Sequence, residues 1–302
     1  MTTIAFIGLG IMGEPMAGHL VDAGHEVIGL NHGQAAVDRL VAHGGRAADT
    51  VAKAVAEADV VITMVPDSPD VEGLAYGEDG IYAHARPGTV HVDCSSIRPD
   101  VARQLAAAGA ERDVRAVDAP VSGGQAGAVE ATLSIMVGGA SADVERVRPL
   151  LETMGGTVVH VGESGAGQTV KAANQLIVAG HLALLAEAIV FLEAHDVDLD
   201  AALAVLGGGL AGSTVLDRKA AGMRERRFEP GFRIDLHHKD LGIVTAAARE
   251  AGVVIPLGAH VAQLVAALRA QGHGGLDHSA LLLLVEQLSG RSGGHPTTGR
   301  EV

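Results

Sequence analysis

The sequence has very few of the residues on which several classes of protein depend. It contains one cysteine, Cys94, and no tryptophan. A single thiol excludes a disulfide framework and a thiolate metal cluster within one chain. The 15 histidines lack the HExxH and HxxxH spacings of metal sites, so we predict no bound metal. Because we expect neither a disulfide nor a basic secretory leader, the sequence predicts a cytoplasmic protein.

Positive charge is also scarce. The chain has 22 lysines and arginines against 36 aspartates and glutamates, which gives a net charge of −14. Such a chain repels anions, so we expect no nucleic acid and no membrane among its partners. The apolar stretch Ala172–Ala194 includes Asn174, Glu187 and further polar residues that are unfavourable inside a bilayer. It is therefore predicted to be a helix that packs against protein, and its apolar surface favours a homodimer or homotetramer.

The remaining composition is hydrophobic and falls into two patterns. The length of 302 residues predicts about two domains, and a hydrophobic content of 48% is enough for sizeable cores. In the first half, short apolar runs alternate with helical patterns, as in a doubly wound parallel sheet covered on both faces. After Gly167 the pattern is helical, beginning at Gln168–Ala194. We expect an α/β domain over 1–164, an all-helical domain over 165–290 joined by this long interdomain helix, and a disordered tail over 291–302.

The first glycine-rich turn has the spacing of a dinucleotide-binding loop. Gly8-Leu9-Gly10-Ile11-Met12-Gly13 is a GxGxxG motif that follows the apolar run Thr3–Ile7 and opens a helical pattern. The first glycine permits a tight turn, the second lets a pyrophosphate approach the backbone, and the third lets helix and strand pack closely. The helix N-terminus adds free N–H groups that attract phosphate. The motif predicts a Rossmann-type domain that binds NAD or NADP, and a purely structural turn is the alternative.

Three further loops are expected at the same edge, because the carboxyl ends of parallel strands lie together. Asn31 and His32 stand where many dinucleotide sites have an acidic residue for the ribose. The absence of a carboxylate there favours NADP slightly over NAD. Met64, Val65, Pro66 and Ser96 follow later strands and are predicted neighbours of the cofactor. Ordinary loop starts, with Ser96 capping a helix, are the alternative.

A second glycine cluster follows the apolar run Arg115–Asp118. Ser122, Gly123 and Gly124 come shortly after Pro120. A Ser-Gly-Gly turn exposes consecutive backbone N–H groups, and such a concavity suits a carboxylate. We therefore predict that these residues bind the acidic end of a substrate, with a plain loop turn as the alternative.

Two lysines in the second half are candidates for chemistry. Lys171 and Asn174 share one face of the long helix, because they are three residues apart. A lysine there can protonate a carbonyl oxygen as a hydride arrives, while Asn174 orients the substrate. Lys239 is expected near the cofactor or the substrate carboxylate. The alternatives are a solvent-facing Lys171 and an ion pair of Lys239 with Asp235.

These motifs together resemble the β-hydroxyacid dehydrogenase family over about residues 3–290. The resemblance rests on Phe6–Gly13, Asp118–Gly124, Gly165–Gly167 with Lys171 and Asn174, and Lys239–Leu241. It implies an NAD(P)-dependent oxidoreductase with Lys171 as the catalytic acid and base. It also implies that Ser122–Gly124 and Asn174 contact the substrate, Ser96 the cofactor, and Lys239 both.

The second half narrows the resemblance. Segments 208–217, 230–237 and 277–281 are similar to those of tartronate semialdehyde reductases. This implies reduction of 2-hydroxy-3-oxopropanoate to glycerate. A 3-hydroxyisobutyrate dehydrogenase, or another short-chain semialdehyde reductase, stays open, and so does a non-catalytic dinucleotide-sensing module. Imine reductases share the fold but usually lack a lysine at the position of Lys171.

Overall fold

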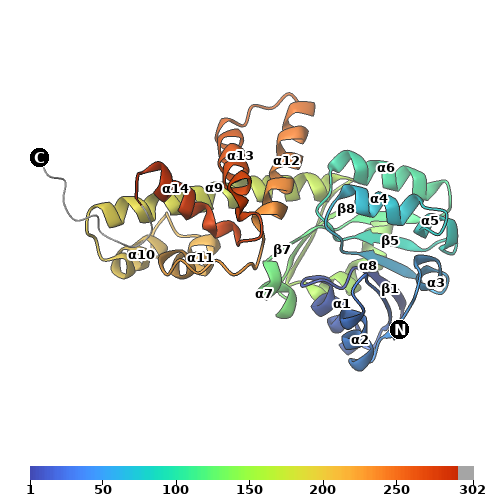
Figure 1. Ribbon diagram of the computed structural model, residues 1–302. Coiled ribbons are helices and arrows are strands. Elements are labelled where there is room, and N and C mark those ends of the chain that lie inside the picture. Colours follow the sequence, from blue (N-terminus) through green and yellow to red (C-terminus); the bar gives the residue numbers. More distant parts are fainter. Residues whose placement is uncertain (292–302) are drawn as a thin grey trace, which may run out of the picture. The chain divides into compact units, whose positions relative to one another are not determined.

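The computed structural model describes residues 1–291 and divides into two compact units (Figure 1). The first unit is Met1–Ala172, and the second begins at Ala173. Domain limits at residues 164 and 290 stay a prediction. The expected tail over 291–302 lies outside the described residues, apart from Arg291.

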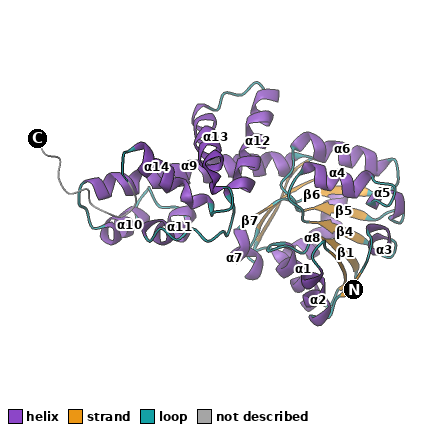
Figure 2. Cartoon of the chain, viewed as in Figure 1, coloured by secondary structure: helices purple, strands orange, loops and turns teal. Residues whose placement is uncertain are grey.

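One nine-stranded sheet forms the centre of the first unit (Figure 2). Its strands run in the order β3-β2-β1-β4-β5-β6-β8-β7, and β9 pairs with β8. The strands are β1 (Thr3–Ile7), β2 (Glu26–Leu30), β3 (Arg46–Ala47), β4 (Val60–Thr63), β5 (Val90–Asp93), β6 (Arg115–Asp118), β7 (Val121–Ser122), β8 (Ser134–Gly138) and β9 (Thr157–Gly162). The parallel half, β3 to β6, confirms the predicted Rossmann-type fold. Because β4 and β5 are buried throughout, both faces of the sheet must be covered.

One strand departs from the parallel arrangement that is predicted for this sheet. Strand β8 runs antiparallel to β6 and to β7, although it is parallel to β9. A parallel return needs a crossover of a dozen or more residues, usually a helix that spans the sheet. Between β7 and β8 the only helix is α7 (Gly124–Val129), with 6 residues. A helix that short reverses the chain at the sheet edge instead of carrying it across.

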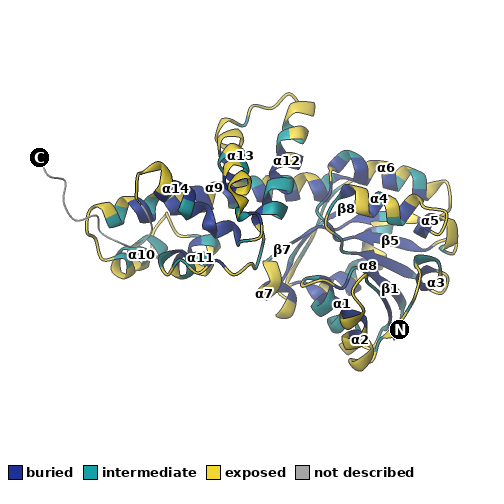
Figure 3. Ribbon diagram, in the orientation of Figure 1, coloured by how far each residue is buried: buried dark blue, intermediate teal, exposed yellow. Residues whose placement is uncertain are grey.

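Helices cover the two faces of this sheet (Figure 1). Residues of α1 (Gly13–Asp22), α2 (Gln34–Ala42), α7 and α8 (Ser141–Met154) join the core on one face. Residues of α3 (Val51–Val55), α4 (Ser68–Tyr76), α5 (Ile81–His84) and α6 (Pro99–Ala110) join the core on the other. Helices α3, α5 and α7 have 5, 4 and 6 residues, too few turns for a periodic pattern to be recognised in the sequence. Burial of the strands between the two layers is visible in Figure 3.

The described part of the second unit is helical. Its elements are α9 (Ala166–Ala194, which starts in the first unit), α10 (Leu199–Gly207), α11 (Thr214–Arg224), α12 (Ile234–Glu250), α13 (Pro256–Leu268), a π-helical turn (Arg269–His273), a 3₁₀ turn (His278–Ala280) and α14 (Leu281–Leu288). Extended pairing there is confined, up to Arg291, to one bridge between Arg233 and Asp277. The predicted helical second part is confirmed.

Helix α9 has two different faces. Ala179, Leu182, Ala186 and Ile189 recur every three or four residues and are buried, whereas Val170, Ile177, Leu184 and Phe191 recur every seven and are exposed. Among the described helices, α9 alone is long and apolar enough to cross a membrane by length and composition. In its most apolar 18 residues, 44% is buried inside the protein. The core helix of a soluble protein can have the same length and composition, so these two properties do not indicate a membrane span by themselves.

Candidate active site

The glycine loop between β1 and α1 has the geometry that the GxGxxG spacing predicts. Gly8 has a φ of 100°, and a Cβ there would lie 2.2 Å from the Met64 carbonyl oxygen. A Cβ on Gly13 would lie 1.9 Å from the Gly8 carbonyl oxygen, so helix and turn touch. At Gly10, by contrast, a Cβ would meet no described atom within 4 Å. Packing therefore requires glycine at positions 8 and 13. Gly10 instead leaves open space beside the backbone, which suits a pyrophosphate.

Asn31 ties this loop to the end of β2. Its Oδ1 accepts a hydrogen bond from the Leu9 N–H at 3.0 Å, and its Nδ2 donates to the Gly33 carbonyl at 3.2 Å. His32, the next residue, is exposed. The structure thus brings Asn31 to the predicted cofactor loop as a support for its backbone.

The ends of β4 and β5 are joined beside it. The Val65 N–H donates to Ser95 Oγ at 2.9 Å, and the Met64 N–H donates to the Ile7 carbonyl at 2.9 Å. These bonds hold the segment that includes Pro66 beside the Ser95-Ser96 loop. Ser96 does not cap the following helix, since Arg98 occupies the N-cap position of α6. That alternative for Ser96 is wrong.

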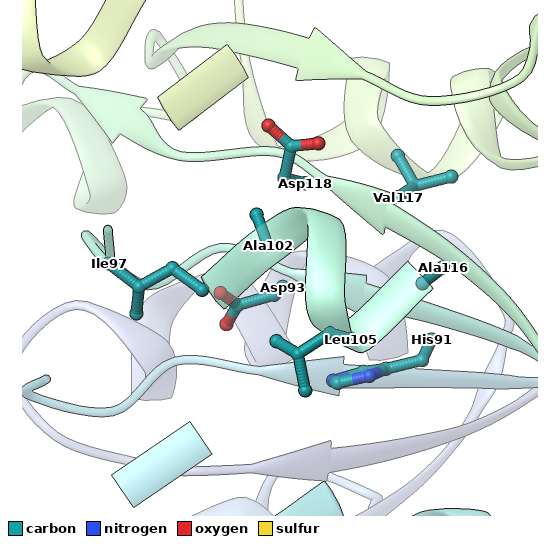
Figure 4. A pocket seen from close by; sticks show the side chains of 8 residues that line it. All are labelled: His91, Asp93, Ile97, Ala102, Leu105, Ala116, Val117 and Asp118. Carbon is teal, nitrogen blue, oxygen red and sulfur yellow. The ribbon is translucent and has the colours of Figure 1, made fainter. Parts of the chain in front are cut away.

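Asp93, at the end of β5, was not singled out from the sequence. Its Oδ1 accepts hydrogen bonds from Thr63 Oγ1 at 2.7 Å and from the Ser95 N–H at 3.2 Å. Its Oδ2 has no hydrogen-bond partner among residues 1–291. It borders a cavity of about 10 Å³, on which His91 and Asp118 also lie (Figure 4). Burial raises the pKa of the Asp93 carboxyl to about 6.

Lys171 lies next to the Ser-Gly-Gly turn. Its Nζ donates to the Val121 carbonyl at 2.7 Å, and the turn Ser122–Gly124 follows directly at the start of α7. Lys171 is only 8% exposed, so the alternative of a solvent-facing lysine is wrong. An ammonium group and backbone N–H groups thus lie in one neighbourhood. Chemically, this arrangement can bind a carboxylate and give a proton to an oxygen nearby.

Asp118 fixes the place where α9 begins. Its two carboxylate oxygens accept hydrogen bonds from the N–H groups of Gly165 at 2.7 Å and Gln168 at 3.0 Å. Burial raises the pKa of Asp118, and these N–H donors oppose that rise. Gln168 in turn donates to the Ser95 carbonyl at 2.7 Å. The first turn of α9, and with it Lys171, is therefore held to two strand ends.

No role is predicted for Asp118 from the sequence. The available signal is its position at the end of a strand, as the first residue of the Asp118–Gly124 motif. Nothing local, however, pointed to the distant N–H groups that it holds.

The second unit brings Asn174 and Lys239 into one network. Asn174 Nδ2 donates to Gln175 Oε1 at 2.8 Å, and Gln175 Nε2 donates to Asp240 Oδ2 at 2.5 Å. Lys239 Nζ lies 3.0 Å from Asp240 Oδ1. Asp235, the alternative partner considered for Lys239, pairs with Arg269 at 2.7 Å instead. That alternative for Lys239 is therefore wrong, because its partner is the adjacent carboxylate.

Within residues 1–291 no group of three or more histidine, cysteine, aspartate or glutamate side chains is placed to hold a metal ion.

Two family models match the chain in succession. One describes the NAD binding domain of 6-phosphogluconate dehydrogenase and matches residues 3–162. The other describes the NAD-binding region of NADP-dependent 3-hydroxyisobutyrate dehydrogenase and matches residues 165–285. Together they account for both units.

Individual relatives match over nearly their whole length. The chain is 40% identical to 2-hydroxy-3-oxopropionate reductase of Escherichia coli over 286 residues, with 95% of this chain and 98% of the relative covered. It is 39% identical to NAD-dependent L-serine dehydrogenase of Pseudomonas aeruginosa over 298 residues, with 96% and 100% covered. A structure of Mycobacterium tuberculosis 3-hydroxyisobutyrate dehydrogenase with L-serine gives a TM-score of 0.85 at 38% identity, with 93% and 98% covered.

Proposed function

Since the chain belongs to the β-hydroxyacid dehydrogenase family, we propose that it reduces 2-hydroxy-3-oxopropanoate to glycerate, with Lys171 as the general acid. The broader activity is that of the family: an NAD(P)-dependent oxidoreductase acting on a CH–OH group. The substrate, the roles of individual residues and a homo-oligomeric state are the proposal. A buried ammonium group beside the Ser122–Gly124 turn favours catalysis over a non-catalytic sensing module, because binding of a dinucleotide alone does not require a proton donor.

The observation that carries the proposal is the placement of Lys171. Its ammonium group is buried and lies 2.7 Å from the Val121 carbonyl, directly before the Ser122–Gly124 turn. In the proposed reaction the N–H groups of this turn bind the substrate carboxylate, and Lys171 gives a proton to the aldehyde oxygen. In the reverse direction Lys171 takes that proton from the alcohol. Asn174 and Lys239 are assigned to substrate binding, and Lys239 also to the cofactor.

The residues of the first unit fit a dinucleotide. We assign its pyrophosphate to the backbone of the Gly8–Gly13 loop, where Gly10 leaves open space. Asn31, Met64–Pro66 and Ser96 are assigned to the same ligand. When bound, NADH or NADPH supplies the hydride that reduces the aldehyde carbon. We propose NADPH as the preferred form, because no carboxylate at Asn31-His32 repels a 2′-phosphate.

The substrate choice rests on what the relatives act on. Glycerate, L-serine and 3-hydroxyisobutyrate are all carboxylic acids with a primary alcohol on carbon 3, and they differ at carbon 2. Identity is slightly higher to the reductase of 2-hydroxy-3-oxopropionate, at 40%, than to the L-serine dehydrogenase, at 39%. The closeness of these values keeps 3-hydroxyisobutyrate and L-serine as the competing substrates.

A steady-state assay tests the proposal. Purified protein is assayed with 2-hydroxy-3-oxopropanoate and with methylmalonate semialdehyde, each with NADH and NADPH. The reverse direction is assayed with glycerate, 3-hydroxyisobutyrate and L-serine, each with NAD⁺ and NADP⁺. We expect the highest kcat/KM for the 2-hydroxy-3-oxopropanoate and glycerate pair, with NADPH. A kcat/KM about tenfold higher for another pair would replace the substrate and leave the family activity intact. Absence of turnover with every pair would overturn the catalytic proposal.

The exposed side of α9 supports the proposed homo-oligomer. Ile177, Leu184 and Phe191 are 56%, 65% and 64% exposed and lie on one stripe of the helix. An apolar stripe of this length is unfavourable in water. We propose that a second copy of the chain covers it.

A further inference from the structure

Gln175 and Asp240 link the two candidate substrate residues of the second unit. Asn174 Nδ2 donates to Gln175 Oε1, Gln175 Nε2 donates to Asp240 Oδ2, and Asp240 Oδ1 faces Lys239 Nζ. We propose that Gln175 and Asp240 are positioning residues that fix Asn174 and Lys239 jointly for the substrate. This inference rests on the roles given to Asn174 and Lys239 in the proposed function.

Burial separates the two inner members of this chain from the two outer ones. Gln175 is 5% exposed and Asp240 is 3% exposed, whereas Asn174 and Lys239 are half-buried. Burying an amide and a carboxylate is unfavourable unless their polar atoms are bonded. Here Gln175 bonds to Asn174 and to Asp240 Oδ2, while Asp240 Oδ1, which makes no hydrogen bond within residues 1–291, lies at the ion-pair distance of 3.0 Å from the Lys239 ammonium group. The buried pair therefore depends on Asn174 and Lys239 for its partners, and it fixes their side chains in return.

The direction of the hydrogen bonds gives the network its specificity. An ionised carboxylate can only accept hydrogen bonds, so Gln175 must turn its amide nitrogen toward Asp240. The amide oxygen of Gln175 then faces Asn174, which must donate a hydrogen bond from its amide nitrogen. The carboxylate at one end thereby sets which way the Asn174 amide faces. The other carboxylate oxygen holds the Lys239 ammonium group, so one residue orients both outer side chains.

Three variants test whether the direction of these hydrogen bonds matters for activity. Asp240→Asn removes the acceptor-only end, so neither amide keeps a fixed direction, and we expect kcat/KM to fall about tenfold or more. Gln175→Glu places two carboxylates next to each other, and we expect its kcat/KM to fall at least as far. The combined variant Gln175→Glu with Asp240→Asn restores every donor-to-acceptor pairing, because the new amide donates to the new carboxylate. We expect it to recover to within about threefold of wild type.

A matched control distinguishes positioning from general damage. Glu286 is another buried carboxylate of the second unit, and it pairs with Arg226. Glu286→Gln makes the same chemical change away from Asn174 and Lys239, and we expect its kcat/KM to stay within about twofold of wild type. Thermal unfolding of each variant is followed by circular dichroism, and Gln175→Met, which removes the bonds without adding charge, replaces any variant that does not fold.

The assay uses whichever short semialdehyde wild type reduces fastest, so an incorrect substrate assignment does not affect the outcome. The expected pattern is loss in both single variants with recovery in the pair, while the control stays active. The inference is overturned if folded Asp240→Asn keeps wild-type kcat/KM. It is also overturned if the pair is no better than its weaker parent.

Discussion

The two units hold their candidate site residues by different means. In the first unit, Asn31, Asp118 and Lys171 bond to backbone groups at the ends of strands and at the start of α9. In the second unit, Asn174 and Lys239 are held through the side chains of Gln175 and Asp240. A backbone group is present whatever the side chain at its position, whereas a hydrogen bond between two side chains is lost when either residue is substituted. The first unit thus sets its site by its fold, and the second by its choice of residues.

Surface character differs as well. Exposed large apolar side chains in the first unit lie scattered over separate elements, whereas those of the second unit include the stripe on α9 and the adjacent pair Val253 and Val254. Scattered apolar residues are ordinary on a protein surface, but a continuous stripe indicates a contact. The surface of the first unit therefore gives no indication of a contact, whereas the stripe on α9 is where we propose that a second copy of the chain binds.

The largest effect is expected at Lys171, where the first unit places the proposed general acid. Lys171→Met keeps the buried bulk and removes the ammonium group, so we expect kcat to fall at least ~100-fold. Lys53→Met in the same unit, which removes an exposed lysine paired with Asp49, is expected to leave kcat unchanged. Steady-state kinetics measures both, and normal turnover in folded Lys171→Met would exclude the assigned role.

The contrast in surfaces predicts the next effect. Leu184→Glu places an unpaired charge in the centre of the α9 stripe, and we expect the dissociation constant of the oligomer to rise at least ~30-fold. Val41→Glu, at another exposed apolar position, is the control. Light scattering over a dilution series gives the mass of each. A wild-type protein that is monomeric at every concentration would refute the proposed assembly.

A smaller effect is expected at Gly10, where the first unit leaves space beside its backbone. Gly10→Ala meets no described atom within 4 Å, so stability should be kept while the dissociation constant for NADPH rises about tenfold. Gly18→Ala, where the nearest described atom is 3.8 Å away, should bind NADPH like wild type. Quenching or enhancement of NADPH fluorescence measures the affinities. Equal affinity in all three proteins would show that the pyrophosphate does not approach Gly10.

The smallest effect concerns Asp93, whose second carboxylate oxygen finds no backbone donor among the described residues. Burial raises its pKa from 3.8 to about 6, so the folded protein disfavours the charged form. The stability that the neutral carboxyl contributes is complete below pH 3.8, the unfolded value, and is lost progressively as the pH rises from there through about 6. Relative to wild type, Asp93→Asn should therefore gain about 1 kcal/mol in free energy of unfolding between pH 5 and 7.5. Urea unfolding at both pH values measures it, with exposed Asp49→Asn as the control that should show no such change. A difference that does not vary with pH would mean that the Asp93 carboxyl has an ordinary pKa.

Much of the fold could be predicted because its signals are local. The strand at Thr3–Ile7, the turn at Gly8 and the following helix are adjacent in sequence, and each needs only its own residues to be recognised. The direction of β8 could not be predicted, because it depends on how the short helix α7 turns the chain between strands. The ion pair of Lys239 could not be predicted either. The spacing of four residues suggested Asp235 as its partner, but Asp235 pairs with the distant Arg269.

The sequence by itself determined that a dinucleotide loop, a Ser-Gly-Gly turn and a lysine on a long helix occur in the order of one enzyme family. Only the tertiary structure decided what holds them. Asp118 reaches the N–H of Gly165 across 47 residues, and Gln175 reaches Asp240 across 65. A motif is a property of neighbouring residues, whereas a hydrogen-bond partner is chosen by the packing of distant segments. The positioning roles of Asp118, Gln175 and Asp240 therefore become visible only in the folded structure, where these distant segments meet.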